Sequence, residues 1–115
     1  MIQIDGVHVQ DSLVALSAAG VPILQVRWLE ARGAEEVVNG AGAVVFGPIR
    51  SWTLRGNDLT FEYGERAATE LGFPTLHELQ LDVPEEEIAR TRDELLEILN
   101  GTCCVIDTPG LRYTD

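Results

Sequence analysis

Residues 49–63 read IRSWTLRGNDLTFEY, and this pattern predicts a β-hairpin. With the central Gly-Asn dipeptide as a two-residue turn, the flanking residues pair in order, from Arg55 with Asp58 outward to Arg50 with Tyr63. Glycine and asparagine accept the positive φ angles that a primed hairpin turn needs. Because side chains alternate faces along a strand, one face of this hairpin collects the large apolar side chains Trp52, Leu54, Leu59, Phe61 and Tyr63. The rest of the chain must cover that face.

The strongest helical pattern lies at residues 84–99. It starts with Pro84 and three glutamates, which suit the positive N-terminal end of a helix, and it stops at Asn100-Gly101. A capping box formed by Asp82 and Glu85 precedes it. The apolar residues share one arc of this helix, namely Ile88, Leu95, Leu96, Ile98 and Leu99. We expect that arc to pack on the apolar face of the hairpin.

Weaker patterns predict the other elements. Alternating or short apolar runs predict strands at residues 2–9, 23–30, 43–46 and 102–106. Capping residues and glycine stops predict short helices at residues 12–19, 65–71 and 75–78. A helix is the alternative for residues 23–30, because Pro22 suits a first helical turn. The glycine-containing segment 31–42 predicts a mobile connection with a single turn at residues 34–38.

These elements together predict one α+β domain over residues 1–115. We expect a mainly antiparallel sheet of about four to six strands, with the hairpin 49–63 at its centre and the helix 84–99 packed on it. A length of 115 residues and a hydrophobic content of 45% are enough for an ordinary core without disulfides or metals.

The charge of the chain restricts its partners. Nineteen acidic residues face eight basic ones, all arginine, for a net charge of −11. Such a chain is repelled by nucleic-acid phosphates and by anionic lipid, so the predicted partner is a basic protein surface. The sequence contains no apolar run long enough to span a bilayer, and MIQID does not resemble a signal peptide, so we expect a cytoplasmic location.

No motif in the sequence predicts catalysis, a metal site or a cofactor. Residues 105–110, VIDTPG, resemble the DxxG signature of GTPases, in which the aspartate holds the magnesium shell. Those enzymes also need a P-loop lysine, and this chain contains no lysine, so the segment is interpreted as a strand followed by a turn.

The cysteines and histidines have simpler interpretations. Cys103 and Cys104 are adjacent, so they lack both the spacing of a zinc site and the geometry of a structural disulfide, and they are predicted to pack in or beside the core. His8 on a strand and His77 on a short helix are predicted to be surface or boundary residues.

The acidic arc of the helix is the candidate binding surface. It carries Glu86, Asp93, Glu94 and Glu97 on three turns, together with Arg90. A basic groove could recognise this row of carboxylates. The alternative is a solvated face held by Glu86–Arg90 and Arg90–Glu94 pairs.

The sequence therefore predicts a small, acidic, non-enzymatic protein-binding domain of a bacterium or its phage. It would act on a larger basic protein as an inhibitor, an immunity or anti-defence protein, or a chaperone-like protein. One alternative is a self-assembling subunit or homodimer that pairs through a sheet edge or the strand at residues 43–46. Another is a ligand-binding or enzyme domain with a pocket under the long helix, gated by residues 33–42. The polar sheet face is a second surface for a partner, with Ser51, Thr53, Thr60 and Glu62.

Overall fold

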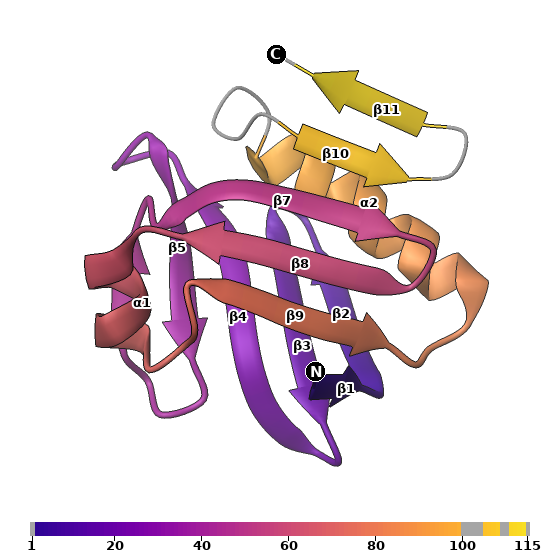
Figure 1. Ribbon diagram of the computed structural model, residues 1–115, viewed down its shortest axis with the longest axis horizontal. Helices are drawn as coiled ribbons and strands as arrows, with labels where there is room; N and C mark the ends of the chain where they lie inside the picture. Colours follow the sequence, from indigo (N-terminus) through magenta and orange to yellow (C-terminus); the bar gives the residue numbers. More distant parts are fainter. Residues whose placement is uncertain (1, 100–104, 109–110, 115) are drawn as a thin grey trace.

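Two β-sheets face each other in the computed structural model of this chain (Figure 1). The structure describes the backbone of residues 2–99, 105–108 and 111–114, and the side chains of residues 2–99. Within these residues the chain forms eleven strands and two helices. The prediction of a mixed α+β fold is confirmed, but nine of these strands form two facing sheets instead of one, and the other two form a separate hairpin.

The five-stranded sheet is a meander of neighbouring antiparallel strands. Its strands follow one another in space as they do in the sequence: β2 (Gly6–Gln10), β3 (Leu13–Ala18), β4 (Val21–Leu29), β5 (Ala34–Asn39) and β6 (Val44–Phe46). The strand predicted at residues 23–30 is confirmed as β4, and the one at residues 43–46 as β6.

The four-stranded sheet contains the hairpin. Its order is β1 (Ile2–Ile4), β9 (Leu76–Leu81), β8 (Asp58–Tyr63) and β7 (Ile49–Arg55), with β1 parallel to β9 and the other pairs antiparallel. The predicted first strand is thus divided at Asp5, because β1 and β2 belong to different sheets. A further hairpin of β10 (Val105–Thr108) and β11 (Leu111–Thr114) lies beside β7 (Figure 1).

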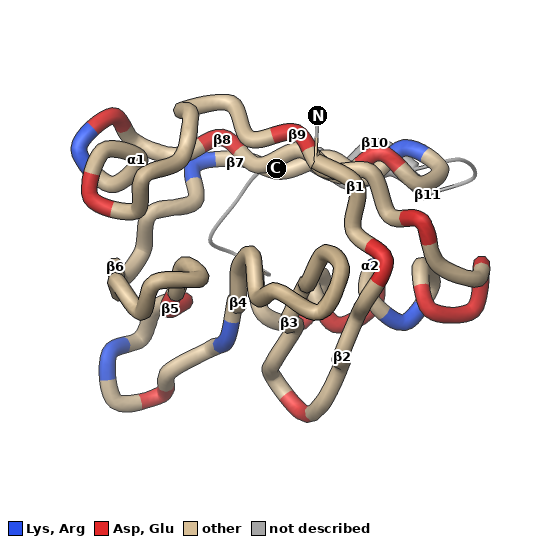
Figure 2. Tube along the Cα trace, turned by 90° about the horizontal axis from the view of Figure 1, so that it is seen from below, with Lys and Arg blue, Asp and Glu red and all other residues tan. Residues whose placement is uncertain are grey.

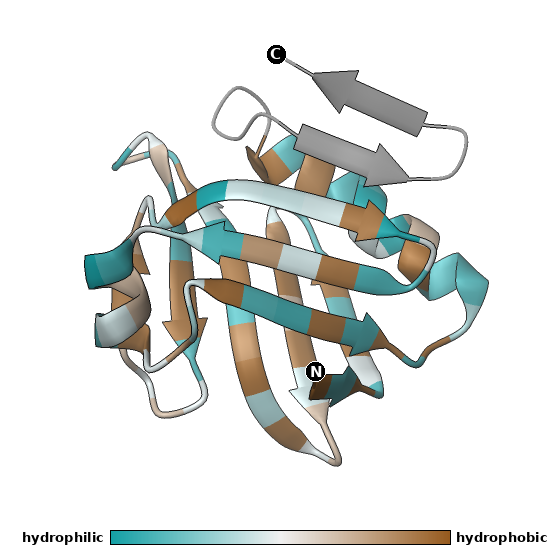
Figure 3. Cartoon of the chain, viewed as in Figure 1, coloured by the Kyte–Doolittle hydropathy of each residue, from teal (hydrophilic) through white to brown (hydrophobic). Residues whose placement is uncertain are grey.

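The predicted register of the β7–β8 hairpin is confirmed from Arg55–Asp58 to Ser51–Glu62. It is wrong at the last pair, because the register shifts after Ser51 and Tyr63 pairs with Ile49. Figure 3 shows apolar and polar residues alternating along β8. The predicted apolar face is fully buried, with every one of its five side chains at most 2% exposed.

The five-stranded sheet supplies most of the cover for this face. Val14, Leu16, Leu24, Val26 and Val37 enter the same core as the hairpin side chains. The helix α2 (Glu85–Leu99) lies against β2, β3 and β4 at one side of the two layers, and α1 (Glu65–Leu71) lies beside β6 at the other (Figures 1 and 2). The long helix was therefore predicted correctly as an element, whereas its role as the main cover was not.

Three predicted segments are wrong in type. Residues 13–18 form β3, residues 34–39 form β5, and residues 76–81 form β9. A helix at residues 12–19, a loop at residues 31–42 and a short helix at residues 75–78 were expected there. In β3 the buried residues are Val14 and Leu16, with the period of two that a strand requires. Ser12 and Ala19 have φ angles of 59° and 52°, so the chain reverses sharply at both ends of this strand.

The helices predicted at residues 65–71 and 84–99 are confirmed as α1 and α2. Gly72 ends α1 in the left-handed conformation with φ 72°, as expected for a glycine after a helix. In α2 the buried residues are Thr91, Leu95, Ile98 and Leu99. No helix in the described part of the chain is both long and apolar enough to cross a membrane.

Candidate functional site

The acidic arc predicted on the long helix lies on the solvent side of α2. Glu86, Asp93 and Glu97 are exposed, while Glu94 is half-buried. From Glu86 to Glu97 the arc extends for roughly 16 Å at the rise of an α-helix. The structure thus places all four predicted carboxylates on one helix, although their surroundings differ.

Glu94 reaches the turn between β2 and β3. Its Oε2 atom accepts a hydrogen bond of 2.7 Å from the backbone N–H of Ser12, which is 82 positions away in the sequence. Burial raises the pKa of Glu94, the N–H of Ser12 lowers it, and the neighbouring carboxyl groups of Glu97 and Asp11 raise it again. Asp11, which sequence reasoning did not include, therefore belongs to the same acidic cluster.

The ion pairs expected to neutralise this arc are not formed. Within the described residues, Arg90 makes no ion pair with Glu86 or Glu94 and instead donates a hydrogen bond of 3.4 Å to the carbonyl oxygen of Val9. Arg92 lies 3.3 Å from Asp93, its neighbour in the sequence, in a pair that is partly open to solvent. The Glu94, Glu97 and Asp11 carboxylates consequently face one another without a compensating arginine among the described side chains.

A groove of about 700 Å³ adjoins the start of this helix. The β7–β8 turn contributes Gly56 and Asn57, and α2 contributes Glu86 and Arg92. Further along the helix, Leu95, Ile98 and Leu99 fill the space against the sheets. The open space next to α2 is therefore beside its first turns, where Glu86 belongs to both the groove and the acidic arc.

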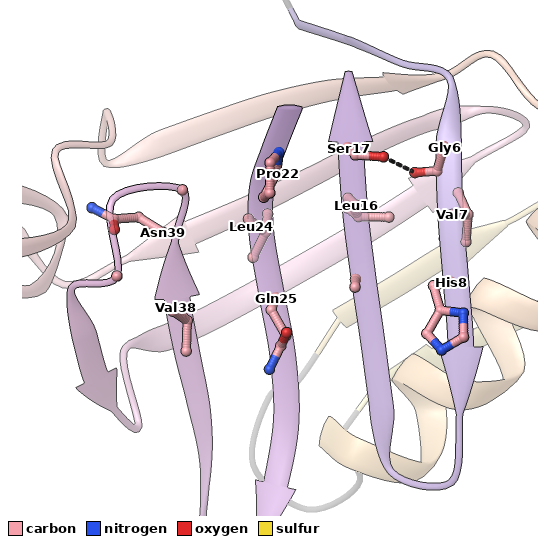
Figure 4. A pocket seen from close by; sticks show the side chains of 13 residues that line it. Gly6, Val7, His8, Leu16, Ser17, Pro22, Leu24, Gln25, Val38 and Asn39 are labelled. Carbon is pink, nitrogen blue, oxygen red and sulfur yellow. Dashed lines mark hydrogen bonds between the residues drawn. The ribbon is translucent and has the colours of Figure 1, made fainter. Parts of the chain in front are cut away.

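A second groove lies on the outer face of the five-stranded sheet (Figure 4). His8, Ala15, Gln25 and Val38 are cross-strand neighbours on β2, β3, β4 and β5, and they form one row across its floor. The groove has a volume of about 510 Å³, and no charged side chain lines it. An uncharged ligand that hydrogen-bonds to imidazole and amide groups would suit this surface.

Two glycines that line the outer groove allow a close approach of neighbouring segments. A β-carbon on Gly40 would collide with the carbonyl oxygen of Pro22, and one on Gly6 would collide with the Oγ atom of Ser17. Asn39 closes one end of the groove, and its Oδ1 atom accepts the N–H groups of Ala41 and Ala43. The sequence did not predict this groove, because it requires β3 and β5, which were expected to be a helix and a loop.

Several titratable side chains are buried away from these grooves, among them Glu35 and His77. Glu35 on β5 is 0% exposed, and its Oε2 atom accepts a hydrogen bond of 3.0 Å from the N–H of Ile49. Its Oε1 atom has no partner among the described residues. Burial raises the pKa of Glu35, and the N–H groups of Glu35 and Ile49 offset part of that rise.

His77 lies in the interior of the four-stranded sheet. It is 2% exposed, its Nδ1 atom is hydrogen-bonded to Tyr63 Oη at 2.9 Å, and its ring stacks on Phe73 at 4.3 Å. Burial lowers the pKa of His77 to about 4 and raises that of Tyr63. The prediction of a surface or boundary residue is wrong for His77 and confirmed for His8, which is exposed.

The remaining candidate residues do not form a site in the described structure. No group of three His, Cys, Asp or Glu side chains within residues 2–99 is arranged to hold a metal ion. The strand predicted at residues 102–106 agrees with β10 only at Val105 and Ile106, because β10 continues through Asp107 to Thr108. Cys103, Cys104 and residues 109–110 of the predicted turn lie outside the described residues.

The polar face predicted for the hairpin is confirmed. Ser51, Thr53, Thr60 and Glu62 all face away from the core, and the Ser51 hydroxyl donates a hydrogen bond of 3.0 Å to Glu62 Oε1.

No known protein family matches the sequence, and neither a curated protein nor a solved structure matches the chain. The candidate surfaces are therefore the acidic cluster of Asp11, Glu94 and Glu97, the two grooves and the sheet edges.

Proposed function

We propose that this protein is a non-enzymatic binding domain that occupies a basic surface on a larger protein, as an inhibitor or a chaperone-like protein does. The observation that carries the proposal is the acidic cluster of Asp11, Glu94 and Glu97, in which the half-buried Glu94 carboxylate is held by the Ser12 N–H. Burial is the main cause of the raised pKa of Glu94, and the like charges of Glu97 and Asp11 add to it. An arginine or lysine of a partner placed among these carboxylates would relieve their repulsion. The net charge of −11 would steer such a partner toward the protein over long range.

The rigidity of this surface favours binding. Glu94 and Glu97 lie on a fifteen-residue helix whose inner arc packs in the core, and Asp11 lies in the β2–β3 turn. Glu94 ties that helix to the turn through the N–H of Ser12, so its carboxylate is held in place before a partner arrives. A preorganised surface loses less side-chain entropy on binding than a flexible one does.

Neutralising the exposed part of the acidic arc tests this proposal. We expect the triple variant Glu86→Gln, Asp93→Asn, Glu97→Gln to bind its partner about 10- to 100-fold more weakly, because exposed charge pairs contribute up to about 1 kcal/mol each. The tagged protein would first be used to capture partners from its native host at low and high salt. The affinity of each purified partner for wild type and variant would then be measured by calorimetry.

A matched control has the same change in net charge at another surface. The variant Asp58→Asn, Glu62→Gln, Glu78→Gln neutralises three exposed carboxylates on the outer face of the four-stranded sheet. It should keep most of the affinity. Equal losses in the two triple variants would mean that only net charge matters, and a partner that binds equally well at high salt would contradict the proposal.

The outer groove of the five-stranded sheet supports a second candidate function, the binding of a small uncharged ligand. The specific observation is that the His8 and Gln25 side chains line the groove without hydrogen-bond partners among the described residues. Nuclear magnetic resonance titration with small amides and sugars at millimolar concentration would test it. Shift changes confined to His8, Ala15, Gln25 and Val38 would support a ligand site, and their absence would count against it.

A further inference from the structure

Strand β6 is a free edge of the five-stranded sheet. It pairs with β5 on one side, and no strand among the described residues pairs with its other side. The N–H of Asn39 donates to Ala43 and the N–H of Gly47 donates to Glu35, so alternate residues of this segment bond to β5. In an antiparallel pair the intervening residues direct their backbone groups outward. Val44 and Phe46 therefore present N–H and C=O groups to a free edge.

The side chains of this edge are apolar and open to solvent. Val44 is 45% exposed and Phe46 is 39% exposed, both on the outer face of the sheet. Edge strands of soluble proteins usually carry a charge or a proline against unwanted pairing, and β6 itself contains neither. The guanidinium of Arg32 lies over this strand, 4.2 Å from the centre of the Phe46 ring.

The edge of β6 opens into a groove of about 370 Å³ that α1 borders on the opposite side. Pro48 and Gly64 line the groove between them and are joined by a hydrogen bond of 3.2 Å from the Gly64 N–H to the Pro48 oxygen. Beyond it, the Asn39 amide donates a hydrogen bond of 2.7 Å to the carbonyl of Leu71 and ties β5 to the end of α1. The groove thus lies between a strand edge and a helix that these hydrogen bonds connect.

The charge around this groove differs from that of the rest of the protein. Arg50 and Arg66 line it, and neither makes an ion pair within the part of the chain that the structure describes. Glu65 and Glu70 line it as well, so with Arg32 the surroundings hold three arginines and two glutamates in a protein of net charge −11. Figure 2 shows basic positions on α1, on β7 and between β4 and β5, around β6.

We propose that β6 binds an extended segment of a partner protein, which adds to the five-stranded sheet as a sixth strand. Backbone hydrogen bonds to Val44 and Phe46 would hold the segment in register. Because side chains alternate along a strand, every second residue would lie beside Val44 and Phe46 and the others would face Arg50 and Arg66. The segment that fits alternates apolar and acidic residues. This surface is separate from the acidic arc of α2, so the two proposals can fail independently.

The first test uses blocked synthetic peptides with the full-length protein. A hexapeptide that alternates valine with aspartate is expected to bind at least tenfold more tightly than one that alternates valine with lysine. Nuclear magnetic resonance titration should place the shift changes on residues 43–50 and 64–70. Equal affinity for the two peptides, or shift changes elsewhere, would overturn the proposed occupant.

Backbone methylation of the peptide tests strand addition directly. Methyl groups on the amide nitrogens of alternate residues remove the hydrogen bonds on one edge of the bound strand and leave the other edge unchanged. Two peptides methylated in opposite phase should therefore differ at least tenfold in affinity. If both bind as well as the parent peptide, side chains alone cause the binding and the proposed strand pairing is wrong.

Two arginine variants complete the test. The double variant Arg50→Gln, Arg66→Gln should weaken the aspartate peptide about tenfold, whereas Arg92→Gln on α2 should leave its affinity unchanged. Sedimentation of the protein alone tests whether a second copy of the chain occupies this edge. A dimer whose concentration-dependent signals map to β6 would show that a second copy occupies the edge, and this result would overturn the proposal.

Discussion

Replacing Phe61 with alanine is expected to lower the free energy of unfolding by about 3–5 kcal/mol. The Phe61 side chain is 0% exposed, pairs across the hairpin with Trp52 and stacks on Tyr63 with ring centres 6.1 Å apart. Its removal leaves a cavity between two sheets that are both fixed by their own hydrogen bonds, so the space can collapse only in part. Urea unfolding followed by tryptophan fluorescence measures the loss.

The neighbouring residue provides a matched control. Thr60 lies on the same strand but faces away from the core, opposite Thr53. We expect Thr60→Ala to change the free energy of unfolding by less than about 0.5 kcal/mol. Losses of similar size in the two variants would mean that the core does not lie on the Phe61 face of the hairpin.

The hairpin could be predicted because local chemistry specifies it at several levels. Alternation, turn residues and cross-strand pairs all indicate the same register. The prediction fails at Arg50 and Tyr63, where the register shifts. The N–H of the adjacent Ile49 bonds to the carboxylate of Glu35 on the other sheet, a tertiary contact that the hairpin sequence does not contain.

The missed strands show where local patterns are insufficient. Leu13 and Leu16 are three residues apart, which suits a helix, but the buried side chains of β3 are Val14 and Leu16. In β5, Glu35 is fully buried two positions before Val37, and a glutamate at a core position hides the alternation of the strand. Packing between the two sheets determines that both segments form strands, and a short segment of sequence alone does not contain that information.

The candidate surfaces could be predicted only where they depend on a single element of secondary structure. Helical periodicity found Glu86, Asp93, Glu94 and Glu97, since that pattern depends on a single element. Asp11 could not be added, because its proximity to Glu94 depends on a contact that spans 82 positions. The strand β6 was predicted, but its place at the edge follows from strand order, which sequence patterns do not determine.

The pH dependence of stability should reveal the buried His77. Burial lowers the pKa of His77 to about 4, while the unfolded chain titrates near 6.5. Between these values the unfolded state binds a proton that the folded state does not, so stability falls as the pH falls across this window. A shift of this size corresponds to about 3 kcal/mol. The free energy of unfolding of the wild type, relative to that of the variant His77→Gln, should therefore decrease by about that amount from pH 7 to pH 4.

Two further variants separate this effect from other titrations. His8 is exposed, so His8→Gln should keep the pH profile of the wild type. Glu35 acts in the opposite sense: burial raises its pKa, so its contribution to stability falls as the pH rises from about 4.5 through that raised value. Glu35→Gln should therefore gain stability over the wild type as the pH rises. If His77→Gln and the wild type had parallel profiles, the His77 ring would have to be protonated or open to water in the folded protein. In that case the Tyr63–His77 hydrogen bond would not be part of a dry core.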